Sequence, residues 1–304
     1  MITVIGAGRV GSAAAFEILR YKLSDVVLID TNLNQAKGEA LDMMQASPAL
    51  EFDGTIEGTN DFSQMQDSEL VIVTAGVARK PGMSRIDLMN TNAKIIRSIS
   101  KNIVKYASDS KLMIVTNPVD IMTYLCYSET NFAPNHIFGM GNILDTMRFR
   151  SHIASELNVS REDTRALVIG EHGDFMVPLV EYASVSGIPL TNLLTTSQIE
   201  KIIQKTINSG SNVIKLKGNT AFAPASAIAL MANAIITGRN RVMSVSTCLK
   251  GQYGQSNLSI GVPVVLGKTG IEKIIEIKLS DNSQEKFNAS VTAIKTAIAA
   301  LKNN

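Results

Sequence analysis

The sequence predicts an α/β fold, in which a doubly wound parallel sheet is followed by a second, α+β half. Through the first half, short β-branched apolar runs alternate with amphipathic stretches. This alternation is typical of right-handed strand–helix–strand units around a parallel sheet buried on both faces. Beyond residue 143 the alternation stops, and longer helices and a hairpin follow. Because a domain has roughly 150 residues, we expect two, at 1–143 and 144–304.

In the first half, each expected strand is a compact apolar run, and each expected helix has apolar residues three and four positions apart. The strands are expected at residues 3–5, 26–29, 70–74, 112–115 and 137–138. The helices are expected at residues 11–21, 33–44 and 87–106.

The second half is expected to contain helices over 145–157, 196–214 and about 284–301, with a strand at 167–169 and a further stretch at 176–185. Residues 221–236 form the most apolar segment, but Pro224, Ser226 and Asn233 favour a buried helix over a membrane span. Two apolar runs, 259–266 and 271–279, are joined by Gly267-Lys268-Thr269-Gly270 and predict an antiparallel hairpin.

Composition excludes several classes of protein. Hydrophobic residues make up 45% of the chain and charged residues 18%, which is typical of neither disordered nor fibrous proteins. The net charge of +2 offers no bulk attraction to nucleic acid or an anionic membrane. Cys126 and Cys248 have no CxxC partner, which excludes a disulfide scaffold and a thiolate zinc site and favours a reducing compartment. Because no basic or apolar leader precedes Gly6, we expect a cytoplasmic protein.

A glycine-rich turn follows the first strand and opens the first helix. Its sequence is Gly6-Ala7-Gly8-Arg9-Val10-Gly11, a GxGxxG pattern of the Rossmann type, whose glycines permit a tight turn, close approach to a pyrophosphate and close helix packing. The helix N-terminus then offers free N–H groups to phosphates. Asp30 ends the second strand, 19 residues after Gly11, where a carboxylate binds ribose hydroxyls and repels a 2′-phosphate. The pattern predicts NAD rather than NADP; the alternative is a strand-end carboxylate without a nucleotide.

Charged and amide side chains follow the later strands of the sheet, where ligands of such folds bind. Arg79 and Arg85 lie on a glycine- and proline-bearing stretch, and Asn117 lies at another strand end. Asp145 and Arg148 are three residues apart, so they share a helix face. Taken singly, the loop arginines are also compatible with a solvated surface, and Asp145 with a helix N-terminal residue.

Three histidines are candidates for proton transfer. His172 lies in Gly170-Glu171-His172-Gly173-Asp174, where a loop between glycines suits an exposed reactive group. His136 precedes an apolar strand and is expected only to pack. His152 is four residues after Arg148 and could reach the same face, but a surface role is the commoner outcome for a helical histidine. We therefore favour His172.

Together these motifs resemble the lactate/malate dehydrogenase family over nearly the whole chain. The segments that carry the resemblance, in the family's order and spacing, are GAGRVG with Asp30, TAGVARKPGMSR, VTNPVD, GNILDTMRFR and GEHGD. The chain is most similar to the family's malate dehydrogenases of lactate-dehydrogenase-like type. The resemblance implies an NAD-dependent oxidoreductase that binds a small dicarboxylate, assembles as a homo-oligomer (a tetramer rather than a dimer) and needs no metal.

The resemblance also implies a role for each matched residue. His172 would be the proton donor and acceptor, and Asp145 would orient it. Arg148 would hold the substrate C1 carboxylate, Arg85 on a closing loop would polarise the reacting carbonyl, and Asn117 would bind the reacting oxygen. The cofactor side would comprise Gly6, Ala7, Gly8, Arg9, Val10, Gly11, Asp30, Asn92, Val115, Thr116 and Asn117.

Arg79 carries the expectation about the substrate. At the matching position, malate dehydrogenases have arginine and lactate dehydrogenases usually have glutamine. A guanidinium can pair with the second carboxylate of oxaloacetate, whereas pyruvate offers only a methyl group. We expect malate and oxaloacetate, with lactate and pyruvate as the alternative. A metal-dependent glycosidase is disfavoured because no Cys/His ligand set is found, and a non-catalytic NAD-binding module because His172 and Asp145 are both present. Residues 217–224 receive no assigned role.

Overall fold

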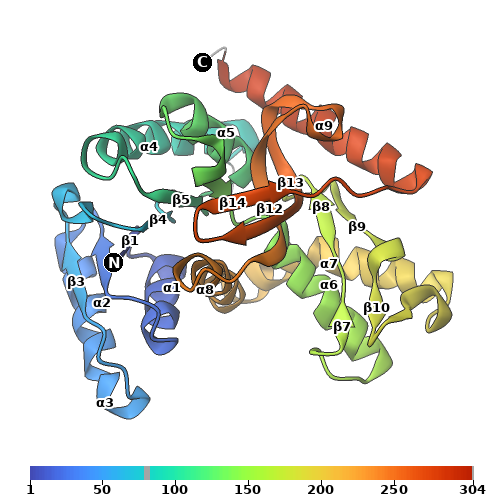
Figure 1. The fold of residues 1–304 in the computed structure, drawn as a ribbon, viewed down its shortest axis with the longest axis horizontal. Helices are drawn as coiled ribbons and strands as arrows, with labels where there is room; N and C mark the ends of the chain where they lie inside the picture. The colour runs from blue at the N-terminus through green and yellow to red at the C-terminus, as the bar shows by residue number, and fades with distance from the viewer. Residues whose placement is uncertain (79–82, 303–304) are drawn as a thin grey trace.

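The computed structural model describes residues 1–78 and 83–302 of the chain. Six parallel strands form the first part of its central sheet, in the order β3-β2-β1-β4-β5-β6 (Figure 1). They are β1 (Ile2–Ile5), β2 (Val26–Ile29), β3 (Ile56–Thr59), β4 (Leu70–Val73), β5 (Lys111–Ile114) and β6 (Ile137–Gly139). This order is that of a doubly wound dinucleotide-binding sheet, in which the switch point lies between β1 and β4.

The register brings the carboxyl ends of the central strands to one edge of the sheet. Ile5 of β1 is paired with Ile29 of β2 and with Val73 of β4, and Val73 is in turn paired with Ile114 of β5. The residues that follow these strands therefore lie beside one another, at the edge where ligands bind in open α/β sheets.

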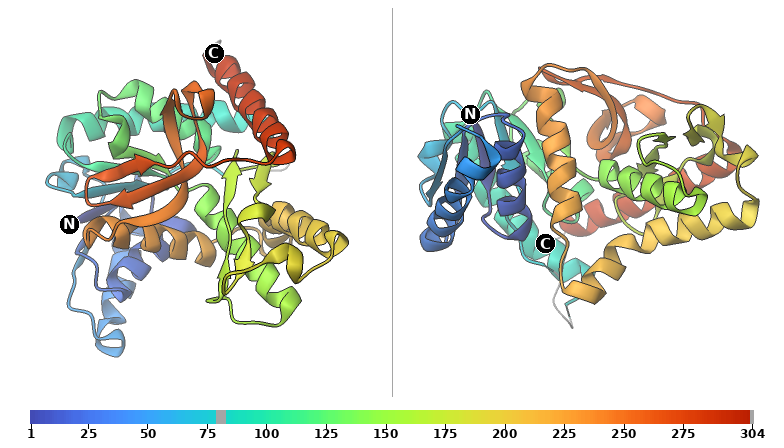
Figure 2. Two further views of the ribbon diagram at one scale, coloured as in Figure 1. Left: turned by 45° about the vertical axis from the view of Figure 1, so that its right-hand side comes forward. Right: turned by 90° about the horizontal axis from the view of Figure 1, so that it is seen from below.

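Helices cover both faces of this sheet. They are α1 (Arg9–Arg20), α2 (Leu33–Gln45), the short α3 (Ser47–Leu50), α4 (Arg85–Tyr106) and α5 (Val119–Glu129). In Figure 1, α4 and α5 lie above the sheet, whereas α1 lies below it. Figure 2 shows α8 (Phe222–Ile236) of the second half beside α1, and the two helices are in contact.

The second half extends the same sheet. Strand β12 (Arg241–Lys250) pairs antiparallel with β6 through Ser246 and Gly139, and β13 (Ser256–Gly267) pairs with β12. Three further strands complete an 11-stranded sheet over the described residues: β8 (Val168–Gly170), β9 (Met176–Pro178) and β14 (Gly270–Ile274). A small second sheet contains β7 (Thr164–Arg165), β10 (Ser184–Val185) and β11 (Ile188–Pro189).

Three long helices accompany α8 in this half, namely α6 (Asn142–Leu157), α7 (Thr196–Lys217) and α9 (Asp281–Lys302). One large hydrophobic core runs from β1 through the sheet to α8 and α9, and a smaller one lies around Phe149, Val168 and Ile202. The large core therefore crosses residue 143. Within the described part of the chain, none of the helices has both the length and the apolar character that a membrane crossing requires.

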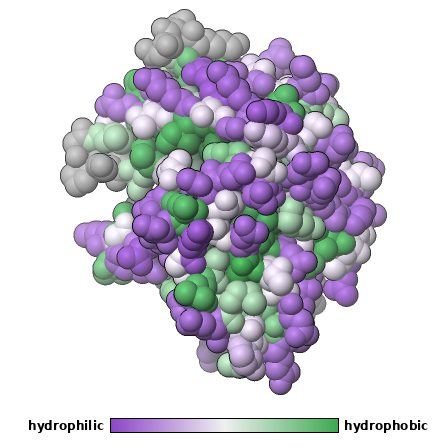
Figure 3. Space-filling model, turned by 90° about the vertical axis from the view of Figure 1, so that its left-hand side faces the viewer, coloured by the Kyte–Doolittle hydropathy of each residue, from purple (hydrophilic) through white to green (hydrophobic). Residues whose placement is uncertain are grey.

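The face of the molecule on the side of β3 is mixed in character. In Figure 3 hydrophilic side chains dominate it, with smaller hydrophobic groups between them. Among the described residues, some large apolar side chains are strongly exposed, including Leu216 (86%) and Phe222 (77%). Such side chains are candidates for contact with another molecule.

The sheet, the hairpin β13–β14 and the expected helices are confirmed, with differences at their ends. Helix α4 begins at Arg85 instead of residue 87, because Ser84 and Asp87 form a capping box. Arg85 is therefore the first residue of a helix. The elements that were not expected include β3, α5 and β12. Helix α5 has buried side chains on most of its surface, so its sequence lacks a clear polar face, and serine and threonine interrupt the apolar run of β12.

Candidate active site

The glycine turn adopts the conformation that its pattern predicts. Gly6 has φ of +109°, which a side chain rarely permits, and a Cβ on Gly11 would lie 1.8 Å from the Gly6 carbonyl oxygen. By contrast, a Cβ on Gly8 would meet no atom within 4 Å. Gly8 is also the N-cap of α1 and provides no side-chain cap, so the first N–H groups of α1 are available to an anion.

Asp30 connects this turn to the end of β2. One carboxylate oxygen accepts a hydrogen bond from the Ala7 N–H at 2.8 Å, and the other accepts one from the Asn32 N–H at 2.9 Å. The side chain remains partly exposed beside the turn. The open space at Gly8, the uncapped helix end and this carboxylate fit the pyrophosphate and adenosine ribose of a dinucleotide.

Asn92 and Thr116 shape the neighbouring crevice through backbone contacts. The buried Asn92 accepts a hydrogen bond from the Val77 N–H at 2.8 Å and donates one to the Asn117 carbonyl at 2.7 Å. The Thr116 hydroxyl donates to the Ala75 carbonyl at 2.7 Å, just after Val115. The Asn92 amide is thus committed to holding the segments after β4 and β5, while the Asn117 side chain is exposed at the strand end.

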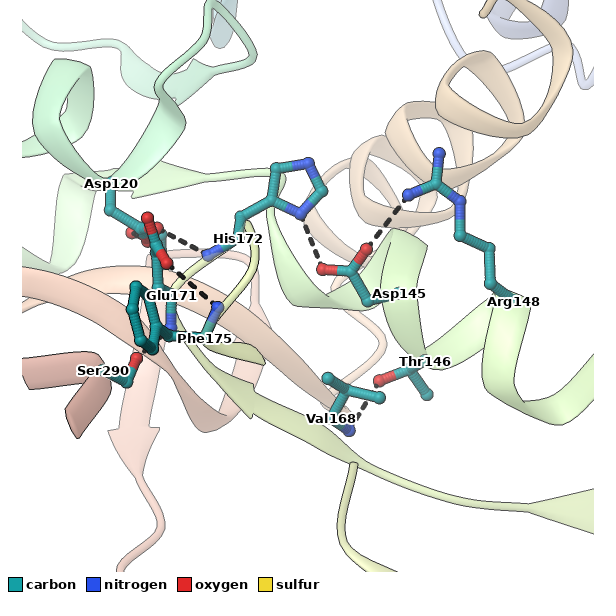
Figure 4. Close-up of polar contacts among 10 residues, drawn as sticks. Asp120, Asp145, Thr146, Arg148, Val168, Glu171, His172, Phe175 and Ser290 are labelled. Atoms are coloured by element: carbon teal, nitrogen blue, oxygen red, sulfur yellow. Dashed lines mark hydrogen bonds and ion pairs between the residues drawn. The ribbon is translucent and has the colours of Figure 1, made fainter. Parts of the chain in front are cut away.

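His172, Asp145 and Arg148 come together as one group (Figure 4). Asp145, fully buried in the first turn of α6, accepts a hydrogen bond from His172 Nδ1 at 2.6 Å with one oxygen and from Arg148 Nη1 at 3.1 Å with the other. Both partner side chains are 15% exposed. With Nδ1–H donated to Asp145, His172 Nε2 is the ring nitrogen left for a substrate.

Opposing effects act on the pKa of His172. Burial lowers it, but the charge and hydrogen bond of Asp145, together with the charge of Asp120, outweigh burial and the repulsion from Arg148. The net result is a pKa above the ordinary value. The imidazolium is therefore more favoured than in an ordinary histidine, which suits a group that must both donate and accept a proton.

Arg85 contacts the histidine loop at a residue beyond His172. Its Nη2 atom forms an ion pair of 2.5 Å with Asp174, two residues after His172. Arg79 lies outside the described residues.

The other two histidines have different surroundings. His152 Nε2 lies 2.9 Å from the Ser209 hydroxyl of α7, so it links α6 to α7, and burial lowers its pKa. His136 is partly buried just before β6, and burial also lowers its pKa. These surroundings differ from those of His172, whose ring contacts Asp145.

Sequence reasoning missed two residues of this site, Asp120 and Ser246. Both are buried; Asp120 accepts hydrogen bonds from the His172 N–H and from the Ser246 hydroxyl. Asp120 was visible only as the last residue of VTNPVD, and nothing local to Ser246 marks it, because its partner is 126 residues away.

A cavity lies elsewhere in the described part of the chain. It measures about 670 Å³, lies between α6 and β12, and is lined by Arg150, Arg165 and Arg241 among others. No candidate site residue of the described chain lines it. A search of residues 1–78 and 83–302 finds no group of three His, Cys, Asp or Glu side chains placed to hold a metal ion.

A dinucleotide-binding sheet joined to a buried carboxylate–histidine–arginine group defines an NAD-dependent dehydrogenase acting on a carboxylate-bearing substrate. Comparison with known proteins agrees. Residues 1–139 match the lactate/malate dehydrogenase NAD-binding domain, and residues 143–304 match the lactate/malate dehydrogenase α/β C-terminal domain. The chain belongs to the lactate/malate dehydrogenase family.

Similar proteins within the family include both kinds of enzyme. A malate dehydrogenase of Methanosarcina barkeri is 45% identical over 303 residues, which is 99% of each chain. A malate dehydrogenase structure from Cryptosporidium parvum has a TM-score of 0.97 at 38% identity and covers 100% of this chain and 99% of that one. A lactate dehydrogenase from Cryptosporidium parvum, solved with lactic acid and NAD, has a TM-score of 0.96 at 34% identity, with coverage of 100% and 98%.

Proposed function

We propose that the chain catalyses the reversible oxidation of (S)-malate by NAD+, which gives oxaloacetate, NADH and a proton. The observation that carries this proposal is the group in which Asp145 accepts hydrogen bonds from both His172 and Arg148. Two functions that the reaction needs, transfer of a proton and binding of a carboxylate, thus meet at one buried residue.

In this proposal the proton moves through His172. Asp145 holds Nδ1–H, so Nε2 of the neutral ring accepts the proton of the C2 hydroxyl as the carbonyl forms. In the reverse direction the imidazolium returns that proton to the carbonyl oxygen. Bound NAD supplies the hydride exchange at C2, and the glycine turn with Asp30 would hold it.

The charged and amide side chains bind the substrate. Arg148 pairs with the C1 carboxylate, a bidentate interaction that lysine cannot reproduce. Arg85 polarises the reacting carbonyl after leaving Asp174, and Asn117 donates to the reacting oxygen. On the cofactor side, Asn92, Val115 and Thr116 fix the crevice where the nicotinamide would lie.

Arg79 decides between malate and lactate in this proposal, by pairing with the second carboxylate. Leaving such a charge desolvated without a partner costs about 2–5 kcal/mol, or roughly thirtyfold to several thousandfold in preference. L-lactate dehydrogenase activity is the second candidate, favoured by the TM-score of 0.96 to the lactate dehydrogenase structure. Because both kinds of enzyme share the fold, the choice between malate and lactate depends on the residues of the site.

The test compares kcat/KM for oxaloacetate and pyruvate with NADH on one preparation, and then repeats both with NADPH. A strong preference for oxaloacetate and NADH is expected. A preference for pyruvate would replace the proposal by its alternative. No turnover of several 2-hydroxy acids with NAD+ at alkaline pH would favour a non-catalytic NAD-binding module.

Further parts of the proposal concern the surroundings of the enzyme. The exposed side chains of Leu216 and Phe222 support a homo-oligomer, for which we propose a tetramer. Cys126 and Cys248, both free thiols, support a reducing compartment such as the cytoplasm. A malate dehydrogenase there would serve the tricarboxylic acid cycle. We keep the division into domains at residues 143 and 144 as part of this proposal.

A further inference from the structure

A second carboxylate, Asp120, lies beside His172 on the side opposite Asp145 (Figure 4). It occupies the first turn of α5 and is 3% exposed. One oxygen accepts a hydrogen bond from the His172 backbone N–H at 2.8 Å, and the other accepts one from the Ser246 hydroxyl at 2.6 Å. His172 is thus held by one carboxylate at its ring and by another at its backbone.

The site around Asp120 joins three parts of the fold. Asp120 comes from α5, His172 follows β8, and Ser246 lies in β12 opposite Gly139 of β6. A Cβ on Gly139 would lie 3.0 Å from the Cβ of Ser246 and 2.9 Å from Val119. The glycine therefore lets β12 and the start of α5 approach closely enough for the serine to reach the carboxylate.

Hydrogen bonding alone does not require a charge at this position. An asparagine of the same shape could accept from the His172 N–H with its oxygen and donate to Ser246, whose hydroxyl can act as an acceptor. A buried carboxylate is also costly, since burial raises the pKa of Asp120 to about 6 despite both hydrogen bonds. What the carboxylate adds over the amide is negative charge next to His172.

We propose that Asp120 is a positioning residue for His172: the ionised carboxylate of Asp120 fixes the histidine backbone and favours the imidazolium form, which donates the proton to the keto acid during its reduction. This inference rests on the proposed function for its catalytic consequence. Its electrostatic part concerns His172 alone and can be tested without turnover.

Other charged groups near His172 also affect its protonation. Asp145 also favours the imidazolium, whereas Arg148 disfavours it, and both come from α6. Glu171, on the loop itself, has its pKa raised, first by burial and then by Asp174, which is paired with Arg85 of α4. Removing the charge of Asp120 leaves all of these groups in place.

The experiment follows the imidazole resonances of the chain by NMR as a function of pH. With three histidines in the sequence, His172 can be assigned through its own substitution. In Asp120→Asn we expect its titration midpoint to fall by about one pH unit, as for removal of a charge a few ångströms away. In Ser246→Ala, where the carboxylate remains but loses a donor, we expect a smaller fall.

Ser290→Ala is the matched control. The Ser290 hydroxyl accepts a hydrogen bond from the Glu171 N–H, so this variant also loosens the loop by one hydrogen bond but removes no charge. Its His172 midpoint is expected to match that of the unmodified protein. A midpoint unchanged or raised in Asp120→Asn, or an equal fall in Ser290→Ala, overturns the inference.

Kinetics provide the second readout. In Asp120→Asn, the alkaline limb of kcat/KM for oxaloacetate should move down in pH with the NMR midpoint, giving about tenfold lower kcat/KM above it. Absence of malate or oxaloacetate turnover in the unmodified protein would reject the proposed function, while the NMR midpoints would still decide the role of Asp120. If Asp120→Asn does not fold, the comparison of Ser246→Ala with Ser290→Ala decides it.

Discussion

Arg85 and Asp174 are joined by an ion pair of 2.5 Å although 89 residues separate them in the chain. Their side chains are 65% and 64% exposed, so water and salt weaken the attraction, and pairs of this kind contribute about 0–1 kcal/mol. The start of α4 is thereby linked to the histidine loop by a contact that is easily broken. In the proposed reaction, a substrate carbonyl would replace Asp174 as the partner of Arg85.

Replacing Asp174 should therefore have much less effect than replacing Arg85. We expect Asp174→Asn to change kcat/KM for oxaloacetate by no more than about fivefold, because only a weak surface pair is lost. Arg85→Gln should lower kcat about 10²-fold or more, because a donor to the developing negative charge is lost. Steady-state kinetics of the two variants at equal ionic strength provide the measurement; equal effects would contradict the assignment of Arg85.

Replacement of Arg79 tests the choice of substrate. In Arg79→Gln the ratio of kcat/KM for oxaloacetate to that for pyruvate should fall by about thirtyfold or more, because the second carboxylate loses its counter-charge while pyruvate no longer faces an unpaired guanidinium. The ratio is measured with NADH on both proteins. If Arg79→Gln kept the full preference for oxaloacetate, another residue would be the discriminator.

Asp30 should determine the preference for NADH over NADPH. Asp30→Ser removes the carboxylate that binds ribose hydroxyls and repels a 2′-phosphate, so the ratio of kcat/KM values should shift toward NADPH by about tenfold or more. The matched control is Asp25→Asn, near the other end of β2, where Asp25 accepts hydrogen bonds from Thr55. The control should keep the original cofactor preference, and a shift of the same size there would count against Asp30.

The pH dependence of the two reaction directions should reflect the raised pKa of His172. Reduction of oxaloacetate needs the imidazolium, so its kcat/KM should hold through pH 6.5, the ordinary value for histidine, and fall only at higher pH. Oxidation of malate needs the neutral ring and should rise over that same interval. Asp145→Asn should move both transitions to lower pH. A transition below pH 6.5 in the unmodified protein would show that the attraction of Asp145 and Asp120 does not outweigh burial.

Asp120 should reduce the stability of the folded protein at neutral pH. Burial raises its pKa to about 6, above about 3.9 in an unfolded chain, so the folded state binds the proton more tightly. The stability that this tighter proton binding provides is fully present below pH 3.9. It is lost as pH rises through 6, by about 3 kcal/mol. Asp120→Asn should therefore raise the free energy of unfolding at pH 7.5 relative to the unmodified protein, but not at pH 4. Urea unfolding at both values tests this; equal differences at the two pH values would exclude it.

Five of the six parallel strands were predictable because they are short, continuous apolar runs, whereas β3, with the sequence IEGT, is not such a run. Helix α5 and strand β12 were not predictable either. Most of their residues are buried because they pack between the sheet and the helices. Their sequences therefore lack the regular alternation of apolar and polar residues that reveals a helix or strand.

For the site, the sequence indicates residue types but not distances. The pairing of Asp145 with Arg148 is local, at three residues along a helix, and could be inferred from spacing. The link from Asp145 to His172 was reached only through resemblance to a family, since the two residues are 27 positions apart and two strands lie between them. The contacts of Asp120 needed the folded chain, because they depend on β12 lying beside β6.

The pairing of Ser246 with Gly139 also bears on how such an enzyme can change by recombination. The C-terminal half cannot be exchanged independently of the N-terminal half. A replacement must supply a strand that fits beside β6 and a hydroxyl that reaches Asp120. A chimaera joined near residue 143 takes β6 and α5 from one parent and β12 from the other, so it should keep its activity only when the two parents match at these contacts. Because both halves contribute strands to one sheet, substitutions at the contacts between them must be compatible in the two halves.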